Sequence, residues 1–251
     1  MHPILFKIGS LTIYTYGVFV FLGVIIGYSL SLKEAKSHHI DKDKFSNLVF
    51  WSILFSFIGA RVFYIITNFK DFLQSPTEYI FSRSGFVFYG GLVFGLVSMF
   101  FYSRKYNIDF LKLLDISAFG ITIGHSIGRL GCFSYGCCYG KPTNSFIGVV
   151  FPIESPVKPI GVRVIPTQLI EAFFLVVIFF ILKYLKRKIN FKGGLFFSYC
   201  FLYGILRFII EFFRGDDRGY FLFFSTSQWF SVFFIFLSIF YFKKMLTKYK
   251  F

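Results

Sequence analysis

The chain has 251 residues, of which 56% are hydrophobic and 24% aromatic, whereas only 16% carry a charge. Ordinary soluble domains carry ~25% charged residues, so this composition excludes a soluble domain built around one core. The net charge of +15 is better explained by loops that face the cytoplasm and its anionic lipids than by nucleic-acid binding.

Seven apolar segments follow one another along the chain, most of them close to or above the ~18 residues that can cross a bilayer. Short polar links join them, without a low-complexity linker or an obvious internal repeat. The first segment lacks the basic start and the cleavage site of a signal peptide, so we expect it to remain as a helix. The sequence predicts an all-α integral membrane protein, a single polytopic domain over residues 1–251 with seven transmembrane helices at roughly 11–32, 46–67, 86–103, 113–131, 167–185, 194–213 and 221–242.

Positive charges are distributed unevenly between the links. Sixteen Lys and Arg residues lie at or after the ends of the first, third, fifth and seventh segments, whereas eight lie before the first segment or in the other links. Cytoplasmic loops of membrane proteins are enriched in Lys and Arg. The sequence therefore predicts an N-terminus outside and a C-terminus in the cytoplasm, in agreement with an odd number of spans.

With this orientation, polar residues of the spans gather in the outer half of the bilayer, and the inner halves are almost purely apolar. The absence of a polar route through the inner halves argues against a small transporter, a channel or a pump. The residues concerned are Tyr14, Tyr16, Arg61, Tyr89 with the following Gly90 and Gly91, His125, Arg129, Gln168, Glu171, Arg207, Glu211, Arg214 and Gln228.

The segment from Gly124 to Gly140 combines five glycines with a single arginine, Arg129. Glycine inside a helix costs ~0.5–1 kcal/mol relative to alanine, so five of them indicate a close backbone approach or a break in the chain. One interpretation is an anion held by Arg129. The other is a tight junction between helix and loop whose arginine extends to the surface.

Arg61, Arg129 and Arg207 are costly inside a membrane, at ~2.5–3.5 kcal/mol each for a residue near the centre. Arg207, Glu211 and Arg214 have the i, i+4, i+7 spacing of one helix face. They are either built around an intrahelical Arg207–Glu211 pair, or they form the polar wall of a cavity in which arginines bind a phosphate. A cationic pocket in the outer half, open to lipid, suits a phospholipid headgroup.

Three of the four cysteines are close together in the sequence, at Cys132, Cys137 and Cys138. Their C-x4-C-C spacing matches no standard zinc pattern, and no histidine cluster accompanies it. We expect small packing residues here, with a catalytic thiol or a metal site as alternatives. Cys200 stands alone in an apolar segment and is expected to pack.

Six short motifs in this order resemble those of the prolipoprotein diacylglyceryl transferase family of bacterial membrane enzymes, over nearly the whole chain. Each motif is weak alone, and the six together are specific. They are Pro3-Ile-Leu-Phe-Lys-Ile-Gly9 with Tyr16-Gly17, Gly59-Ala-Arg-Val-Phe-Tyr64, Gly85-Phe-Val-Phe-Tyr-Gly-Gly91, Gly128-Arg-Leu-Gly-Cys-Phe133 through Gly140, Pro166-Thr-Gln-Leu-Ile-Glu171, and Tyr203-Gly-Ile-Leu-Arg-Phe-Ile-Ile-Glu-Phe-Phe-Arg214.

The resemblance implies transfer of the diacylglyceryl group of phosphatidylglycerol to the lipobox cysteine thiol of a preprolipoprotein, with a thioether formed and glycerol 1-phosphate released. It implies the bacterial cytoplasmic (inner) membrane, membrane lipid as a partner, and no metal, organic cofactor or nucleic acid. Arg129 would bind the lipid phosphate, Arg207 would stabilise charge on the departing phosphate, and Glu211 would orient Arg207. The other residues implied in substrate binding are Tyr16, Arg61, Gly131, Gly140 and Arg214.

The chain departs from the family pattern at three positions. The third-helix motif usually reads His-Gly-Gly, and here it begins with Tyr89; Cys132 replaces an asparagine and Cys137 an acidic residue. A tyrosine with a pKa near 10 is a poor base at neutral pH. Either the base lies elsewhere, or an arginine lowers the pKa of Tyr89 or of the incoming thiol, or the chain is an altered paralogue that binds phospholipid or lipoprotein without transfer.

Overall fold

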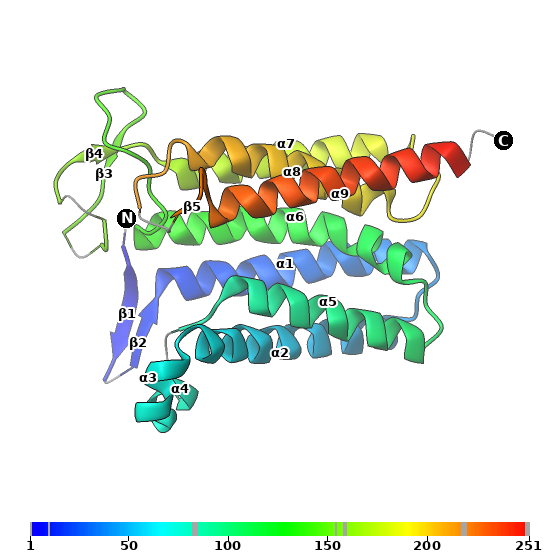
Figure 1. Ribbon diagram of the computed structural model, residues 1–251, viewed down its shortest axis with the longest axis horizontal. Coiled ribbons are helices and arrows are strands. Elements are labelled where there is room, and N and C mark those ends of the chain that lie inside the picture. The colour runs from blue at the N-terminus through cyan, green and yellow to red at the C-terminus, as the bar shows by residue number, and fades with distance from the viewer. Residues whose placement is uncertain are drawn as a thin grey trace. The chain divides into compact units, whose positions relative to one another are not determined.

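The computed structural model describes residues 2–9, 11–81, 85–153, 155–157, 160–216 and 220–248, and Figure 1 labels its elements. Residues Met1–Ser31 and Leu114–Phe251 form one compact unit, and Leu32–Leu113 form another. The helices are α1 (Thr15–Ser37), α2 (Lys42–Thr67), α3 (Phe69–Gln74), α4 (Pro76–Phe81), α5 (Phe88–Lys105), α6 (Phe110–Tyr135), α7 (Thr167–Leu185), α8 (Gly194–Glu211) and α9 (Thr226–Lys248).

Each of the seven expected spans coincides with one long helix. Among the described residues, six of these helices are long and apolar enough to cross a membrane, namely α1, α2, α6, α7, α8 and α9. The remaining one, α5, has 18 residues and ends in Arg104 and Lys105, so its apolar part is shorter. The helical membrane class is therefore confirmed. Four of the charges counted for orientation, Arg83, Lys158, Arg218 and Lys250, lie outside the described residues.

Two of the helices begin later than expected because short antiparallel hairpins precede them. Strands β1 (Ile4–Ile8) and β2 (Leu11–Tyr14) pair before α1, and β5 (Tyr220–Phe221) and β6 (Phe224–Ser225) pair before α9. A third pair, β3 (Val149–Val150) with β4 (Arg163–Val164), lies in the link between α6 and α7. Short apolar runs do not distinguish strand from helix, so the expected starts at residues 11 and 221 were wrong.

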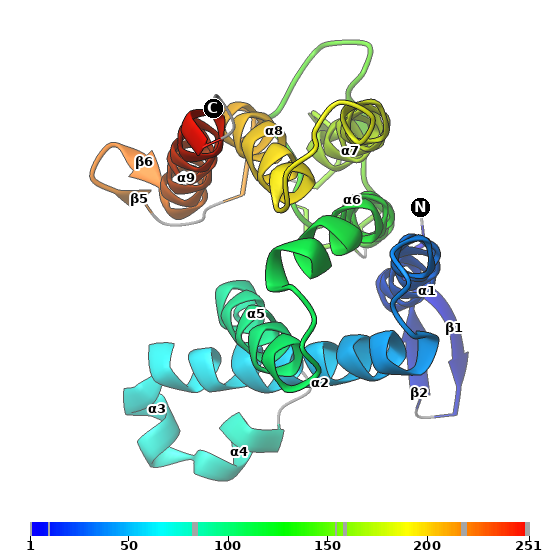
Figure 2. The same ribbon diagram turned by 90° about the vertical axis from the view of Figure 1, so that its right-hand side faces the viewer.

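Helices α1 and α6 approach closely through four glycines of the first unit, and Figure 2 shows them side by side. A Cβ atom on Gly23 would lie 2.8 Å from the carbonyl oxygen of Gly124, and one on Gly27 would lie 2.7 Å from that of Gly120. Gly23 and Gly27 are four residues apart on α1, and Gly120 and Gly124 are four residues apart on α6. This is the small-xxx-small packing of membrane helices, in which backbone surfaces replace side chains at the contact.

The same unit contains a core formed by α6, α7 and α8. Ala118, Leu175 and Leu182 are fully buried, and Phe119, Ile178, Leu195, Tyr199 and Cys200 are nearly so. Asp115 accepts hydrogen bonds from the backbone amides of Gly193 and Phe196 at 2.6 and 2.9 Å. A carboxylate of α6 thus caps the positive N-terminal end of α8 and fixes the two helices to each other.

The second unit consists of α2 to α5 and the links between them. Helices α2 and α5 cross at Gly59 and Gly90, where an added Cβ on Gly59 would lie 2.5 Å from the carbonyl oxygen of Gly90. The Gly-Gly pair after Tyr89 therefore serves a helix contact.

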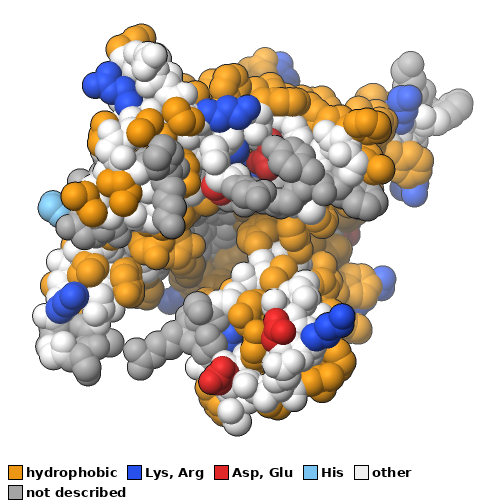
Figure 3. Space-filling view, turned by 60° about the vertical axis from the view of Figure 1, so that its left-hand side comes forward, with side chains coloured by type: hydrophobic (Ala, Val, Ile, Leu, Met, Phe, Trp, Pro, Cys, Tyr) orange, Lys and Arg blue, Asp and Glu red, His pale blue; other side chains and the backbone are white. Residues whose placement is uncertain are grey.

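Large apolar side chains face outward on the membrane helices. Phe57, Phe173, Phe180 and Phe236 are each more than half exposed, and orange apolar side chains predominate on the face in Figure 3. A water-soluble chain would bury such residues, whereas lipid tails solvate them.

Candidate functional site

Glu171 lies at the centre of a buried polar cluster in the first unit. Its side chain has no exposed surface, and its Oε1 atom lies 2.9 Å from Nη2 of Arg129 on α6. The hydroxyl of Tyr203 on α8 donates a hydrogen bond to the same oxygen at 3.0 Å. The second turn of α7 therefore carries the carboxylate that neutralises Arg129.

Arg207 joins this carboxylate to a second one. Its Nη1 lies 3.7 Å from Oε2 of Glu171, and its Nη2 lies 2.6 Å from Oε2 of Glu211, one turn further along α8. Ser227 at the start of α9 accepts a further hydrogen bond from Arg207 at 3.1 Å, and Ser225 donates to Glu211 at 2.8 Å. The guanidinium of Arg207 is thus fixed from three elements.

His125 lies against the same cluster. Its Nε2 is 3.9 Å from Oε1 of Glu171, and its Nδ1 is 3.4 Å from the hydroxyl of Tyr199. The ring packs edge-on against Tyr203, with 4.8 Å between centroids. A carboxylate on one side of an imidazole favours the tautomer that leaves the other nitrogen as a proton acceptor.

Among the described residues, no hydrogen-bond partner is found for three buried charged atoms of the cluster, Nε of Arg129, Nη1 of Arg207 and Oε2 of Glu171, although the last two form an ion pair at 3.7 Å. Buried donors are normally satisfied, so two guanidinium N–H groups are available for an acceptor. Phosphate oxygens form charge-assisted hydrogen bonds of this kind. The arrangement can therefore hold an anionic ligand between α6 and α8.

Arg214 does not continue the helix face of Arg207 and Glu211, in contrast to the expected i+7 position. Helix α8 ends at Glu211, and Arg214 lies in an isolated antiparallel bridge with Gly140. Its guanidinium is buried and bonds both oxygens of Asp216 at 2.7 and 2.6 Å. Burial alone would lower the pKa of Arg214, but this carboxylate raises it above the ordinary arginine value.

Gly140 and Gly131 both lie where a side chain would collide. A Cβ on Gly140 would lie 2.7 Å from the carbonyl oxygen of Ile165 and 2.8 Å from that of Phe213. A Cβ on Gly131 would lie 2.9 Å from Cβ of Phe19 and 3.2 Å from the carbonyl oxygen of Tyr16. These glycines thus allow backbone segments to pack.

Tyr16 stands in the first turn of α1 and is 42% exposed. Its ring lies 6.4 Å from that of Tyr135 at the end of α6, a contact close enough for aromatic packing. Part of the Tyr16 side chain is therefore exposed, and the ring also packs beside the last turn of α6.

The two remaining expected site residues belong to the second unit. Arg61 donates a hydrogen bond to the carbonyl oxygen of Gly85 at 2.9 Å, and its guanidinium lies 4.8 Å from the ring centre of Phe86. Tyr89 stands in the first turn of α5 and packs edge-on against Phe88, with 5.8 Å between centroids.

Cys132, Cys137 and Cys138 come together at the end of α6, with all three sulfur atoms within 4.8 Å of one another. Hydrogen bonds from the Cys132 and Cys137 thiols lower the pKa of Cys138, and the positive charge of Arg214 adds to this effect. Hydrogen bonding to Cys132 and Cys138 raises the pKa of Cys137. The three thiols therefore interact as a group.

Sequence reasoning recognised the arginines but gave no role to Glu171 or His125. One signal was present, because buried arginines require nearby carboxylates, and Glu171 is an acidic residue of a span at the expected depth. Tyr199, Tyr203 and the serines around α9 carried no comparable signal, since their hydroxyl groups are ordinary in an aromatic-rich membrane helix.

A multi-pass helical membrane protein with buried arginines around a carboxylate is the class that this fold and site define. The family model described as prolipoprotein diacylglyceryl transferase matches residues 3–243. The chain therefore belongs to the prolipoprotein diacylglyceryl transferase family.

Among its relatives, a phosphatidylglycerol–prolipoprotein diacylglyceryl transferase of Clostridium tetani is 37% identical over 242 residues, covering 96% of this chain and 97% of the relative. Transferase 2 of Clostridium perfringens is 35% identical, with 93% and 91% covered. The transferase of Finegoldia magna is 34% identical, with 86% and 85% covered.

Proposed function

We propose that the chain transfers the diacylglyceryl group of phosphatidylglycerol to the lipobox cysteine thiol of preprolipoproteins. Relatives that carry this activity in their names match it over almost their full length. The observation that carries the proposal is the pair of unsatisfied guanidinium donors on Arg129 and Arg207, beside a fully buried carboxylate.

In this reaction the cysteine sulfur attacks the glycerol carbon of the diacylglyceryl group that bears the phosphate ester. A carbon–sulfur thioether bond forms, the carbon–oxygen bond to the phosphate breaks, and glycerol 1-phosphate leaves with the electron pair. The thiol proton passes to a base. Negative charge thus increases on the phosphate in the transition state, where fixed cationic donors stabilise it most.

Arg129 binds the phosphate through Nε, and Arg207 stabilises the departing phosphate through Nη1. Glu171 keeps both cations in place before the lipid arrives, and Glu211 orients Arg207 through its 2.6 Å ion pair. Preorganised charges of this kind need little reorganisation during the reaction.

Two residues are candidates for the proton acceptor. Tyr89 occupies the position at which the family usually has histidine, but a tyrosine is a poor base at neutral pH. His125 lies beside Glu171 in the arginine cluster, and a neutral imidazole presents a nitrogen lone pair that accepts a thiol proton. We assign the base to His125 and a hydrogen-bonding role toward substrate to Tyr89.

The remaining residues are assigned to substrate binding or to the elements that carry the site. Tyr16 lines the headgroup region, and Arg61 adds a positive charge for the lipid. Arg214, Gly131 and Gly140 hold the backbone around the end of α6, which carries Arg129. Their contacts support a role in positioning the substrate-binding elements.

The chain crosses the bacterial cytoplasmic membrane seven times as a single domain over residues 1–251, with the N-terminus outside and α5 as the third span. Both substrates, phosphatidylglycerol and the lipobox segment, then reach the arginine cluster from the outer leaflet. The excess of Lys and Arg in alternate links supports this orientation.

One alternative is a paralogue that binds phospholipid or lipoprotein without transfer. Tyr89, Cys132 and Cys137 favour it, because they replace residues usual in the family. The purified protein in detergent, mixed with phosphatidylglycerol and a lipobox peptide, distinguishes the two. The transferase releases glycerol 1-phosphate in proportion to lipidated peptide, whereas binding of the lipid without any release identifies the paralogue.

A further inference from the structure

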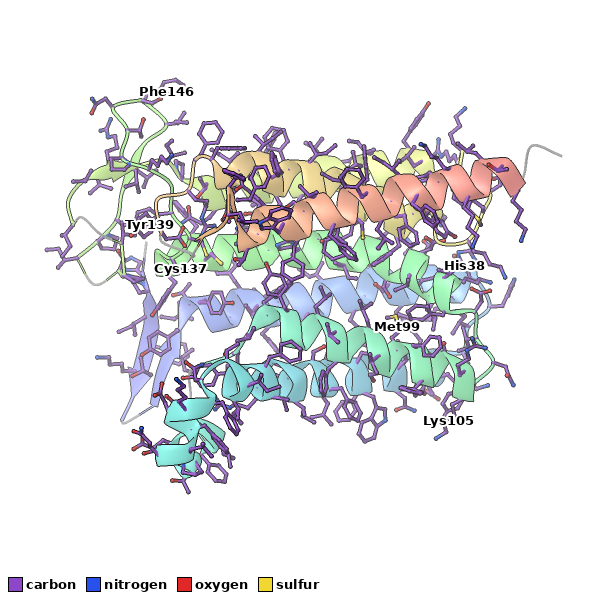
Figure 4. The ribbon with its side chains drawn as sticks, viewed as in Figure 1. His38, Met99, Lys105, Cys137, Tyr139 and Phe146 are labelled. Atoms are coloured by element: carbon purple, nitrogen blue, oxygen red, sulfur yellow. The ribbon has the colours of Figure 1, made fainter. Side chains whose placement is uncertain are left out.

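The three cysteines at the end of α6 owe their proximity to the way this helix ends. The amides of Gly136 and Cys137 both bond to the carbonyl oxygen of Cys132, at 2.9 and 3.1 Å. Gly136 adopts a φ of +87°. This is a C-terminal cap with a left-handed glycine: the Gly136 bond is that of the αL motif, and the Cys137 bond is the 6→1 bond of a Schellman motif. Figure 4 labels Cys137 at this point.

Cys138 has a left-handed backbone as well, with a φ of +66°. Such a conformation is uncommon for a residue with a side chain. It brings a third sulfur to Cys132 and Cys137, so that the three atoms lie within 4.8 Å of one another. None of the three forms a disulfide, and all are partly exposed.

Neighbouring groups hold this turn from the outside. The side-chain amide of Gln168 donates to the carbonyl oxygen of Cys137 at 2.6 Å, and the hydroxyl of Thr167 donates to that of Cys138 at 2.7 Å. The guanidinium of Arg214 interacts with Cys138. Hydrogen bonds and charges around a metal centre typically orient its ligands in this way.

We propose that Cys132, Cys137 and Cys138 form a binding site for one thiophilic metal ion of the Zn²⁺ class, with the three sulfur atoms as ligands. Zinc binds thiolates at about 2.3 Å in tetrahedral geometry, so its sulfur ligands lie about 3.8 Å apart. The three sulfurs need to close by only about 1 Å. Each thiol that binds releases its proton to solvent, and the fourth position takes water or another small ligand.

The ion would secure the end of α6 directly after Arg129. The site goes beyond the transferase reaction, and it can be tested without any activity measurement. The sequence spacing did not indicate it, because the helix cap, rather than a recognised zinc motif, brings the sulfurs together.

The test uses the 251-residue protein in detergent under a thiol-free reductant. After treatment with a chelator and removal of the chelator, Zn²⁺ is added, unbound ions are removed by gel filtration, and metal per chain is measured by mass spectrometry. Cys200→Ser is the matched control, because Cys200 is buried and stands apart on α8. We expect one ion per chain in the unmodified protein and in Cys200→Ser, and at least a tenfold lower affinity in Cys132→Ser and Cys138→Ser.

A second measurement tests the proposal even where the cysteine variants fail to fold. In the unmodified protein, bound Zn²⁺ should protect three thiols against alkylation and leave the alkylation of Cys200 unchanged. Cd²⁺ should give a thiolate charge-transfer band that the variant lacking all three cysteines does not show. Zinc binding no stronger than that of this triple variant, or an equal loss in Cys200→Ser, would overturn the proposal.

Discussion

The carboxylate of Glu171 and the guanidinium of Arg129 form a buried ion pair with 2.9 Å between Oε1 and Nη2. The pair connects the second turn of α7 with α6, and Arg207 of α8 joins it through the second carboxylate oxygen at 3.7 Å. One acidic side chain thus faces two buried cations, and Glu211 supplies a second carboxylate to Arg207 at 2.6 Å.

Glu171→Gln should strongly destabilise the protein. The substitution keeps the shape of the side chain but leaves Arg129 and Arg207 buried without their shared counter-charge. Loss of one partner of a buried pair costs about 3–5 kcal/mol of unfolding free energy. Denaturation of the detergent-solubilised protein measures it, with Glu78→Gln on an exposed face of α4 as the control. Equal stability of the two variants would mean that Glu171 does not hold the arginines.

Arg129→Lys should abolish most of the transfer although the positive charge remains. Lysine lacks the planar guanidinium, whose several N–H groups can bond Glu171 and a phosphate at the same time. We expect a loss of about 10²-fold or more in kcat/KM, typical of a lost transition-state donor. Arg187→Lys, an exposed residue after α7, should retain full activity. Similar activity of the two variants would remove Arg129 from the phosphate site.

His125→Gln should lower kcat by about 10²- to 10⁴-fold, the usual contribution of a general base. Tyr89→Phe should have the smaller effect, because it removes one hydroxyl and no base. Single-turnover lipidation of a lipobox peptide compares the two, after membrane insertion of both has been verified. The opposite order would assign the base to Tyr89.

Gly27→Ala should weaken the packing of α1 against α6. The new methyl group would lie 2.7 Å from the carbonyl oxygen of Gly120, and backbone at such a contact must shift. Overpacking of this kind costs about 1–3 kcal/mol. Gly17→Ala on the same helix meets nothing within 4 Å, so its thermal stability in detergent should equal or exceed that of the unmodified protein. A stable Gly27→Ala variant would contradict the close helix contact.

Apolar length was sufficient to place the long helices of this fold, but it did not predict the short helices α3 and α4. Each expected span coincides with a helix, since runs of this length are specified by the bilayer. The hairpins before α1 and α9 were not predictable in the same way. The hairpin residues are mostly apolar, like the helices that follow them. Only the strand pairing across Gly9 and around Leu222 distinguishes the hairpins from the helices.

The sequence predicted the charged residues of the site but not the contacts between them. Both arginines and both glutamates of the cluster stand out in sequence because charge is rare in a membrane span. Glu171 meets the arginines only after α6, α7 and α8 have packed, and no spacing in the sequence encodes that contact. The expected position of Arg214 on the helix face of Arg207 and Glu211 was wrong. Helix α8 ends at Glu211, so it does not extend as far as Arg214.

Complementation tests the central claim most directly. The chain is expressed in a bacterium depleted of its own transferase, and incorporation of labelled lipid into a lipoprotein is followed together with membrane insertion of the chain. The account predicts that the unmodified chain restores lipid incorporation and that Arg129→Ala, inserted equally well, does not. A fully inserted, unmodified chain that never restores incorporation would contradict the transferase assignment.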